Sequence, residues 1–360
     1  MSNNEMKYLF IEPLDVWLFR NGRPFNSQED HTAQGTFPPF PSTVQGILRT
    51  HHLALHEVNI HDETAVTNHV GTRRTYPENF QLTGPFIACR QNEQIIRYFP
   101  LPQDLYLDGD QHAYRIFTFK PEATVYTDIT QRAQLQLLYR HNEQEPQKDD
   151  SEGGKWIAEA ELDAYLRGQD IPQNKVIPGS NLFTTEARVG IGLNSQQRVT
   201  EEGKLYEVKF ARPKADVGLA VGVAGLEGWP AESVIAVGGE AKAGVYQPCA
   251  AWSPHHPTCL LNQFKIVFLT PTYFAEGWQS ENWGQFFTGN AQLITAVVGR
   301  PLIWGGRDLA TNQHEPSYRY VPAGSVYYFR GEAELKLPYM TDKPDQFGPI
   351  GFGQFAIGGW

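Results

Sequence analysis

The stretch from Ile11 to Leu55 constrains the fold of this chain most strongly, because it predicts a strand, a stiff loop and a helix in direct succession. Residues 9–19 are rich in apolar and aromatic side chains, which is typical of a strand. Residues 20–23 then turn the chain, and Pro24 cannot continue a central ladder. The run FPPFP at 37–41 has too many prolines for a helix or a paired strand, so it forms a rigid approach to the helix that follows.

The helix is expected to begin at Ser42. Serine is a preferred N-cap residue, and Gln45 follows at the spacing of a capping box. Four apolar residues behind the cap share one helical face: Val44, Ile47, Leu48 and Leu55. A strand, a loop and a capped helix therefore form the opening unit of the fold.

Three arginines border the joints of this opening unit: Arg20, Arg23 and Arg49. Guanidinium groups pair with phosphate oxygens, and a helix start offers free backbone N–H groups to an anion, here at Ser42 and Thr43. The sequence therefore predicts an anion site at the helix start. The alternative is that Ser42 only caps the helix and that nearby carboxylates take the arginines. These carboxylates are Asp15, Glu29 and Asp30.

The formal net charge of −10 disfavours indiscriminate nucleic-acid binding, because contacts of lysine and arginine with phosphates dominate such affinity. The charge is unevenly spread, however. Residues 143–170 hold nine acidic and three basic side chains, which predicts an acidic, loop-like insertion at about 142–170. Residues 186–214 hold six basic and four acidic side chains, so the sequence also allows a local basic track on an acidic protein.

General features favour a cytoplasmic protein with two domains. A length of 360 residues suffices for two domains with cores of their own. No apolar run approaches the roughly 20 residues of a membrane helix, and the first ten residues do not resemble a signal peptide. Three cysteines are too few for the disulfide framework of a small secreted domain.

After the first helix, the pattern predicts short strands with few helices. Residues 86–90 and 94–99 are expected to form a hairpin, which completes a β-α-β-β order. Residues 156–166 are expected to form a short helix. A projecting hairpin with a polar tip is expected at about 188–209.

The C-terminal part predicts a second strand-then-helix region. A strand is expected at 265–269 and a helix at 289–298, with a further hairpin from 325–329 and 333–337. Strands and helices interleave without the regular alternation of a doubly wound fold, which favours two α+β modules.

Two glycine-containing segments are candidate contacts to a nucleic-acid backbone. Gly351 and Gly353 lie in the tail, where glycine permits a positive φ or a close approach to phosphate. If Phe352 and its apolar neighbours anchor a strand, the two glycines share its bare opposite face; the alternative is a turn at a sheet edge. The segment 238–244 lacks the G-K-[ST] ending of a P-loop, which argues against nucleotide hydrolysis and leaves Lys242 as a candidate contact.

Metal binding has little support in the sequence. The weak candidates for a zinc site are Cys249, His255, His256 and Cys259. Their spacing is not a common finger pattern, and neighbouring prolines crowd it. His52 and His56 are four residues apart on the expected helix, but no third ligand follows at a recognisable spacing. We therefore expect no metal and no cofactor.

Two blocks in the opening unit resemble the third subunits of the Cmr complex, the type III-B CRISPR effector. These subunits belong to the RAMP superfamily. The pattern W-x-F-R-x-G-R-P-F runs from Trp17 to Phe25, and F-P-P-x-P-S-T-x-x-G-x-x-R runs from Phe37 to Arg49. Further blocks follow in matching order before the glycine-rich tail: 186–191, 203–206, 238–240, 270–278 and 321–327. The resemblance covers most of the chain.

The resemblance implies tandem ferredoxin-like, RRM-related RAMP domains with insertions and a glycine-rich C-terminal loop. We place the domains at 1–215 and 216–360, with the acidic loop and the projecting hairpin in the first. The resemblance further implies a non-catalytic subunit that binds the 5′ tag of the CRISPR RNA (crRNA) and caps one end of the complex. The implied protein partners are the large, polymerase-like second Cmr subunit and the first backbone subunit, which is the fourth Cmr subunit.

The residues that we expect to contact RNA are Arg20, Arg23, His31, Ser42, Thr43, Arg49, Arg188, Lys242, Gly351 and Gly353. Unpaired RNA is also recognised by stacking, for which Phe37, Phe40 and Tyr76 are candidates, although each suits a core equally well.

Two other functions are alternatives. A RAMP-superfamily endoribonuclease acting on repeat RNA needs a general acid or base, and His31 lies in the loop nearest the expected RNA track. In Cmr complexes, however, cleavage belongs to other subunits, so we expect His31 to be a contact residue and the chain to be no enzyme. The second alternative is an assembly protein without RNA contact.

Overall fold

The computed structural model describes most of the chain. The described residues are 5–20, 32–72, 75–77, 79–110, 112–126, 134–139, 153–193, 200–254, 256, 262–305, 307–308, 313–314 and 316–360. Four of the predicted candidates lie outside these ranges: Arg23, His31, His255 and Cys259. Residues 140–152 of the acidic insertion and residues 194–199 at the hairpin tip also lie outside them.

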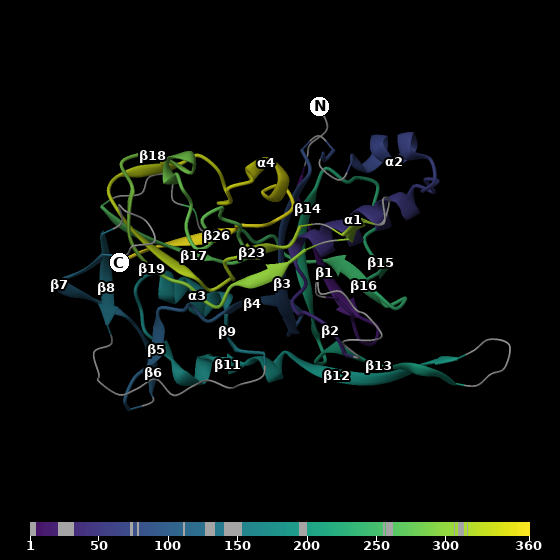
Figure 1. Ribbon diagram of the computed structural model, residues 1–360, viewed down its shortest axis with the longest axis horizontal. Coiled ribbons are helices and arrows are strands. Elements are labelled where there is room, and N and C mark those ends of the chain that lie inside the picture. The colour runs from purple at the N-terminus through teal and green to yellow at the C-terminus, as the bar shows by residue number, and fades with distance from the viewer. Residues whose placement is uncertain are drawn as a thin grey trace. The chain divides into compact units, whose positions relative to one another are not determined.

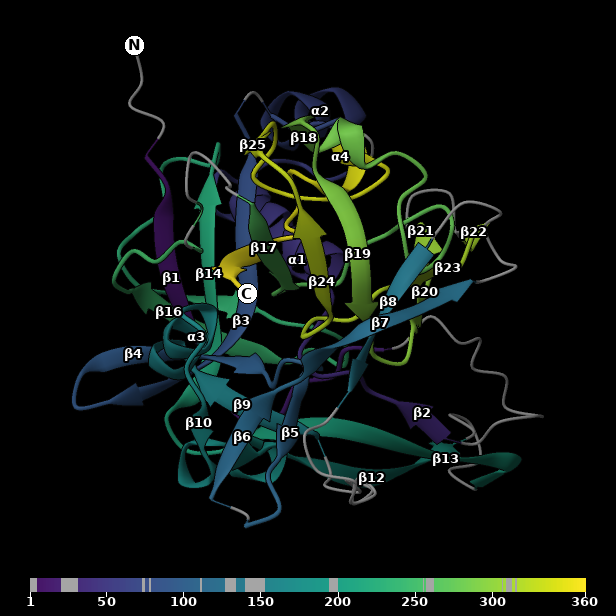
Figure 2. The ribbon, with the colours of Figure 1, turned by 90° about the vertical axis from the view of Figure 1, so that its left-hand side faces the viewer.

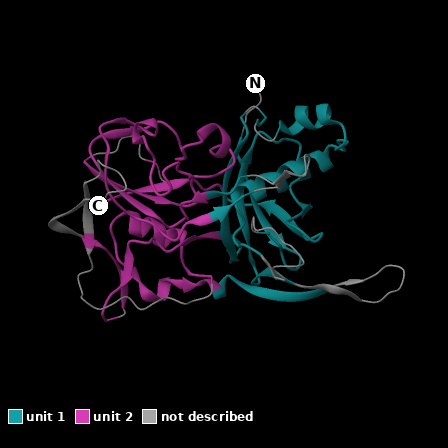
Figure 3. Cartoon of the chain, in the orientation of Figure 1, with its two compact units in different colours: residues 1–95, 180–250, 303–318 teal, residues 96–179, 251–302, 319–360 magenta. Residues whose placement is uncertain are grey.

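The chain forms two compact units, and each unit combines three segments of the sequence (Figure 3). Unit 1 comprises Met1–Ile95, Ser180–Ala250 and Ile303–Tyr318. Unit 2 comprises Ile96–Gly179, Ala251–Leu302 and Arg319–Trp360. The expected division between residues 215 and 216 stays a prediction.

Unit 1 contains two described helices, α1 (Pro41–Leu55) and α2 (Glu63–Val70). Its strands are β1 (Lys7–Pro13), β2 (Thr32–Gln34), β3 (Gln81–Gln91), β12 (Phe183–Leu193), β13 (Thr200–Pro213), β14 (Val217–Ala224), β15 (Ser233–Ala236), β16 (Ala243–Pro248), β21 (Arg307–Asp308) and β22 (Gln313–His314). Elements that include a unit boundary are β4 (Gln94–Pro100), η2 (Gly179–Asn181), β20 (Leu302–Trp304) and β23 (Tyr318–Tyr320).

Five strands of unit 1 pair in the order β3-β14-β1-β16-β15, and all these pairings are antiparallel. Helix α1 covers one face of this sheet (Figure 1). Tyr246 on β16 faces the helix, since its ring centre lies 5.3 Å from that of His51 on α1. Ile11 on β1 is paired with Tyr246 and lies on the same buried face.

Strands β12 and β13 form a long antiparallel hairpin that projects from the rest of unit 1 (Figure 1). Phe183 lies opposite Pro213 at its base, and β2 pairs in parallel with β13. The hairpin expected at about 188–209 is thus confirmed, with strands that reach further toward the base.

The opening strand is shorter than expected. β1 ends at Pro13, and the next apolar residues pair with β13 instead, through reciprocal backbone hydrogen bonds of Trp17 and Ala211 at 2.9 and 2.8 Å. Val16 and Leu18 pack in a buried cluster with two residues of β13. The continuous apolar run at 9–19 therefore serves two different sheets.

Unit 2 contains the helices α3 (Glu159–Leu166) and α4 (Pro344–Phe347) and the 3-10 turns η1 (Gln173–Lys175) and η3 (Trp283–Gln285). Its strands are β5 (Leu105–Leu107), β6 (Ala113–Ile116), β7 (Thr118–Tyr126), β8 (Gln134–Tyr139), β9 (Lys155–Ala158), β10 (Ile171–Pro172), β11 (Ile177–Pro178), β17 (Gln263–Phe268), β18 (Phe287–Gly289), β19 (Gln292–Val297), β24 (Val326–Arg330), β25 (Ala333–Leu335) and β26 (Phe355–Gly359).

Four strands of unit 2 pair in the order β19-β24-β17-β26, and Figure 2 shows β19, β24 and β17 side by side. The helix expected at 289–298 is therefore wrong, because β19 occupies this stretch and pairs with β24. Ile294, Thr295 and Val297 are β-branched, which favours a strand. A largely aromatic core packs around this sheet and includes Phe264, Phe268, Phe274, Phe286, Tyr327 and Phe329.

The helix expected at 156–166 is shorter than predicted. Trp156 and Ile157 belong to β9, which pairs with β4, and α3 begins only at Glu159. Leu162 and Tyr165 of α3 are buried, as the shared apolar face predicts. Residues 155–166 are therefore core elements and do not belong to the acidic loop.

The described residues form mostly antiparallel sheets with few helices, which is compatible with the predicted α+β class. The tandem ferredoxin-like arrangement stays a prediction. None of the helices in the described ranges is long and apolar enough to cross a membrane.

Candidate nucleic-acid interface

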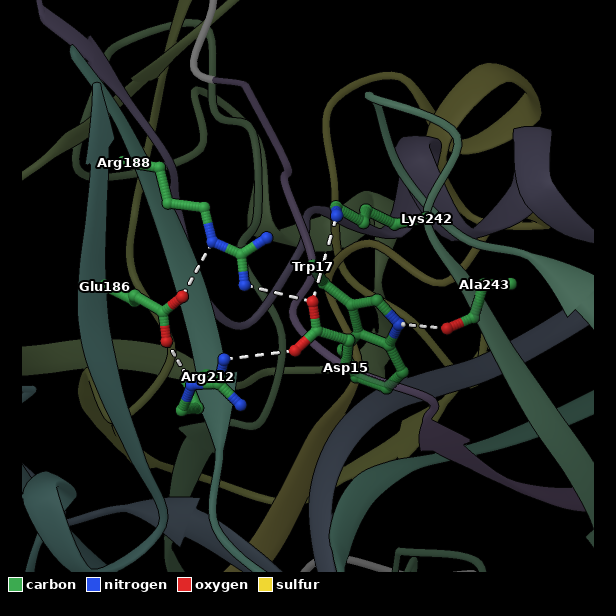
Figure 4. Close-up of polar contacts among 7 residues, drawn as sticks. All are labelled: Asp15, Trp17, Glu186, Arg188, Arg212, Lys242 and Ala243. Atoms are coloured by element: carbon green, nitrogen blue, oxygen red, sulfur yellow. Dashed lines mark hydrogen bonds and ion pairs between the residues drawn. The ribbon is translucent and has the colours of Figure 1, made fainter. Parts of the chain in front are cut away.

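Arg188 and Lys242, two of the residues expected to contact RNA, meet at the base of the β12–β13 hairpin (Figure 4). Asp15 lies between them. Its Oδ2 is 3.0 Å from Nη2 of Arg188 and 3.8 Å from Nζ of Lys242. Its Oδ1 is 3.0 Å from Nη2 of Arg212.

Glu186 bridges the same two arginines. Its Oε1 lies 2.7 Å from Nε of Arg188, and its Oε2 accepts a hydrogen bond from Nε of Arg212. Two carboxylates and two guanidinium groups thus form a closed ring, which Lys242 joins through Asp15. We call these five residues the Asp15 cluster: Asp15, Glu186, Arg188, Arg212 and Lys242.

Backbone pairing places the members of this cluster. Glu186 and Arg188 are two residues apart on β12, so their side chains share one face. Arg212 lies opposite Thr184, on the diagonal from Glu186, which is within reach of a long side chain. Trp17 positions the chain beside Asp15, because its indole Nε1 also donates to the carbonyl oxygen of Ala243 at 3.2 Å.

Gly238 and Gly239, shortly before Lys242, let a tight turn pack closely against Leu18 in the segment after β1. Gly238 has a φ of 75°, and a Cβ there would lie 2.4 Å from the carbonyl oxygen of Leu18, so the turn requires glycine. The N–H of Gly239 donates to the same oxygen at 2.9 Å. The turn therefore delivers Lys242 to Asp15 and does not form a phosphate cradle.

The two carboxylates are held in their charged form. The hydrogen bond from Arg188 lowers the pKa of Asp15 below its usual value, and the one from Arg212 lowers that of Glu186. Three cations face two carboxylates, so the cluster keeps one positive charge. Its side chains are 21–46% exposed, and salt therefore screens these contacts.

Phe210 adds a second restraint on two of the cations. The guanidinium carbon of Arg188 lies 5.1 Å from the centre of its ring, and Nζ of Lys242 lies 5.3 Å from it.

Arg212 was not expected as a site residue, although it lies in the basic stretch 186–214. The register of β13 against β12, which sequence composition does not show, brings it beside Arg188.

The start of α1 does not form the expected anion site. The helix begins at Pro41 with Phe40 as its N-cap, and the Ser42 hydroxyl has no hydrogen-bond partner among the described residues. Proline suits the first helical position, which explains the earlier start. The N–H groups of Thr43 and Val44 donate to the carbonyl oxygen of Phe40 at 2.9 and 3.3 Å, so the fold already uses them.

Arg49 also serves the fold. Its Nη2 donates to the carbonyl oxygens of Gly71 and Thr72 at 2.9 and 3.0 Å, and burial lowers its pKa. It therefore fastens the end of α2 to α1. The side chain of Arg20 is exposed, and its backbone forms an isolated bridge with Gly35.

The three aromatic candidates for base stacking already contact other rings. The ring centre of Phe37 lies 4.8 Å from that of Phe183, Phe40 stacks on Trp304 at 4.4 Å, and Tyr76 stacks on Phe80 at 5.5 Å. These contacts assign the three rings to the packing of unit 1.

The glycine-rich tail turns where a strand with a bare face was expected. Gly351 and Gly353 are buried and have φ values of 95° and 68°. The carbonyl oxygen of Gly351 accepts a hydrogen bond from the Thr270 hydroxyl at 2.7 Å, and the N–H of Gly353 donates to Pro271 at 2.9 Å. The alternation of an extended strand fails here, because β26 begins only at Phe355.

The described zinc candidates have other contacts. Nε2 of His256 lies 2.7 Å from the carbonyl oxygen of Phe355, and the side chain of Cys249 packs against a buried apolar cluster that includes Phe10. Within the part of the chain that the structure describes, no group of three or more His, Cys, Asp or Glu side chains is placed to hold a metal ion.

The chain matches the family model described as CRISPR-associated protein (Cas_Cmr3) over residues 9–360. A match of this extent identifies a subunit of the type III-B CRISPR effector, the Cmr complex. The chain belongs to the Cas_Cmr3 family, which confirms the resemblance seen in the sequence.

Similar chains occur in solved structures, and two of these are of the type III-B Cmr-beta complex. One is the structure of the type III-B Cmr-beta complex bound to cognate target RNA and AMPPnP. Its matching chain is 15% identical in sequence to this one, and the alignment covers 89% of this chain and 86% of that chain with a TM-score of 0.48. The other is Cmr-beta bound to cognate target RNA, with 16% identity, the same 89% and 86% coverage, and a TM-score of 0.47. A search of curated proteins finds no match.

The Asp15 cluster predicts that Asp15 fixes the base of the hairpin. Asp15→Asn removes the negative charge that lies between Arg188, Arg212 and Lys242, so these three cations repel one another more strongly. Backbone hydrogens of β12 and β13 should then exchange faster near the base of the hairpin. Hydrogen exchange at low salt measures this effect.

Glu186→Gln is the matched control for Asp15→Asn. It removes the same charge from the same two arginines, but Glu186 belongs to the hairpin and cannot tie it to the segment after β1. A smaller effect is expected. Equal exchange in the two variants would contradict the tethering role of Asp15.

Proposed function

We propose that this protein is a non-catalytic subunit that binds the 5′ tag of crRNA and caps one end of the type III-B complex, in antiviral defence. The observation that carries the proposal is the family match over residues 9–360. In this proposal the chain docks on the large, polymerase-like second subunit and also meets the first backbone subunit, the fourth in the Cmr complex.

Four described cations of unit 1 are the proposed RNA contacts: Arg20, Arg188, Arg212 and Lys242. The Asp15 cluster supports this choice, because it holds a net positive charge at the base of a projecting hairpin on an otherwise acidic protein. Arg23 and His31 stay predictions, and Arg212 joins the proposed contacts through its place in the cluster. Thr43, Arg49, Gly351 and Gly353 are not proposed, because hydrogen bonds within the fold already use them. Ser42 is not proposed because its hydroxyl oxygen is buried.

The triple variant Arg20→Ala/Arg188→Ala/Lys242→Ala should bind tag RNA more weakly. Each lost phosphate contact lowers the slope of log affinity against log salt by about 0.7 for a single strand, so three contacts lower it by about 2. Binding titrations of the purified chain at several salt concentrations measure both effects, with melting curves to confirm folding.

A control triple should replace three exposed basic residues of unit 2: Arg115, Lys175 and Arg300. It changes the net charge by the same amount and should leave the salt slope nearly unchanged. If both triples lose affinity equally, the proposed contacts have no special role and only the total charge matters.

The alternative of a repeat-specific endoribonuclease is tested in the same reactions. We expect repeat RNA to stay intact with and without Mg²⁺. Products that form reproducibly and vanish in His31→Ala would support the nuclease instead.

A further inference from the structure

Four of the eleven histidines gather in unit 1, where α1 meets α2 and the loop between β14 and β15. The ring centre of His52 lies 4.3 Å from that of His56 and 5.9 Å from that of His69. His51, the fourth, lies 4.9 Å from the ring of Trp229. We call His51, His52, His56 and His69 the histidine cluster.

Trp229 holds His52 in one tautomer. The indole Nε1 of Trp229 donates a hydrogen bond to Nδ1 of His52 at 3.1 Å. An indole N–H is a donor only, so Nδ1 must supply a lone pair and the ring proton must lie on Nε2. A protonated histidine carries hydrogens on both nitrogens. Protonation therefore breaks this bond and sets two N–H groups against each other.

The surroundings of His52 also oppose protonation. The side chain is only 7% exposed, and the charged groups that act on it are all basic. They are His51 on α1, His56 at the C-cap of α1, His69 on α2 and Lys7 on β1. Burial first, and these neighbours next, lower the pKa of His52 from its usual 6.5 to about 4.

The loop that carries Trp229 is fastened to α1 at this place. Nε2 of His56 lies 3.1 Å from the carbonyl oxygen of Glu227, and a Cβ on Gly228 would lie 2.9 Å from the same imidazole. Helix α2 is lightly held, since Val70 is the one buried residue in it. Both elements therefore contact the histidine cluster, in addition to the hydrogen bonds from Arg49 to the end of α2 and from the Tyr246 hydroxyl to the carbonyl oxygen of Pro230.

We propose that His52 and Trp229 form a pH-sensitive latch, which holds residues 225–232 on α1 at neutral pH and releases them in acid. The released state takes up a proton on His52 near pH 6.5, whereas the closed state does so only near pH 4. The released state thus binds more protons between these values, and the ratio of closed to released protein falls about tenfold per pH unit below 6.5. The latch does not depend on the proposed RNA binding.

Hydrogen exchange of the full-length chain at pH 7 and pH 4.5, corrected for the intrinsic rates, tests the latch. Protection of residues 225–232 and of α2 should fall in acid by more than tenfold, while the strands of unit 2 stay protected. His52→Asn should keep the protection at pH 4.5, because the amide oxygen accepts the indole hydrogen bond and does not titrate.

His61→Asn is the matched control, since His61 is exposed and lies outside the histidine cluster; it should behave like the wild type. Trp229→Phe removes the donor and should lower the protection of 225–232 already at pH 7, which keeps the test informative if His52→Asn folds poorly. Full protection of the wild type at pH 4.5, or an equal loss in His52→Asn, would overturn the latch.

Discussion

Replacing Gly353 with alanine should lower the melting temperature by about 5 °C or more, before any RNA is added. Gly353 has a φ of 68°, a left-handed conformation that costs an L-residue about 1–2 kcal/mol. A Cβ there would also lie 2.1 Å from the carbonyl oxygen of Met340, so backbone must move. The two effects together should cost about 3 kcal/mol or more in the free energy of unfolding.

Gly359→Ala is the matched control for Gly353→Ala. It makes the same substitution in the same tail, but a Cβ at Gly359 meets nothing within 4 Å. Thermal melts followed by circular dichroism compare the two variants directly. If both melt like the wild type, the turn at 348–353 does not restrain Gly353.

The second large effect is expected at Asp104, which sits in a fully buried polar cluster of unit 2. Asp104 and Lys265 are both 0% exposed, and Nζ of Lys265 lies 3.8 Å from Oδ2 of Asp104. The hydroxyl of Tyr165 donates to Oδ1 of Asp104 at 2.7 Å, and that of Tyr328 donates to Oδ2. Among the described residues, Nζ of Lys265 has no hydrogen-bond partner, and it lies 3.5 Å from the ring centre of Tyr165.

Asp104→Asn should therefore destabilise the protein by about 3–5 kcal/mol, because it leaves a buried ammonium group without its anion. In a Lys265→Met background the same change should cost at least about 1 kcal/mol less, since no charge is then stranded. Chemical denaturation of the wild type, the two single variants and the double variant measures this difference. Equal costs in both backgrounds would show that the ion pair does not form.

The same cluster predicts how stability depends on pH. Burial lowers the pKa of Lys265 from its usual 10.5 to about 8. Between these values the unfolded chain binds more protons than the folded one, so the contribution of Lys265 to stability rises with pH across this window and is lost below it. The stability of the wild type relative to Lys265→Met should accordingly increase from pH 8 to pH 10. A flat or falling difference would contradict this assignment.

The sequence predicted those helices and hairpins whose conformation is decided by residues close together in the chain. The hairpin around 188–209 was found because a polar link separates two short strand-like segments, and the helix after FPPFP because its apolar residues recur at helical spacing. The helix at 289–298 was wrong because strand pairing with β24 decided the conformation of β-branched residues. The start of α1 at Pro41 was also missed. Ser42 is of a residue type that often caps helices, but it lies inside the first turn and Phe40 is the N-cap.

The candidate site shows where such reasoning ends. Arg188 and Lys242 were selected from family motifs and local charge, but their meeting at Asp15 depends on three chain segments that only the folded protein brings together. The tail glycines were misread for a related reason. Periodicity assumes an extended backbone, and neither the turn nor the distant Met340 that closes on Gly353 is visible in the neighbouring residues.

Crosslinking of crRNA inside the reconstituted type III-B complex tests the proposed function most directly. Ultraviolet irradiation, followed by mass spectrometry of this chain and sequencing of the attached RNA, identifies both sides of each contact. We expect the crosslinked nucleotides to lie in the 5′ tag, and the crosslinked peptides to include residues 183–213 at the hairpin. Crosslinks that lie only in the guide region, or an intact complex in which this chain gives none while other subunits do, would contradict tag binding.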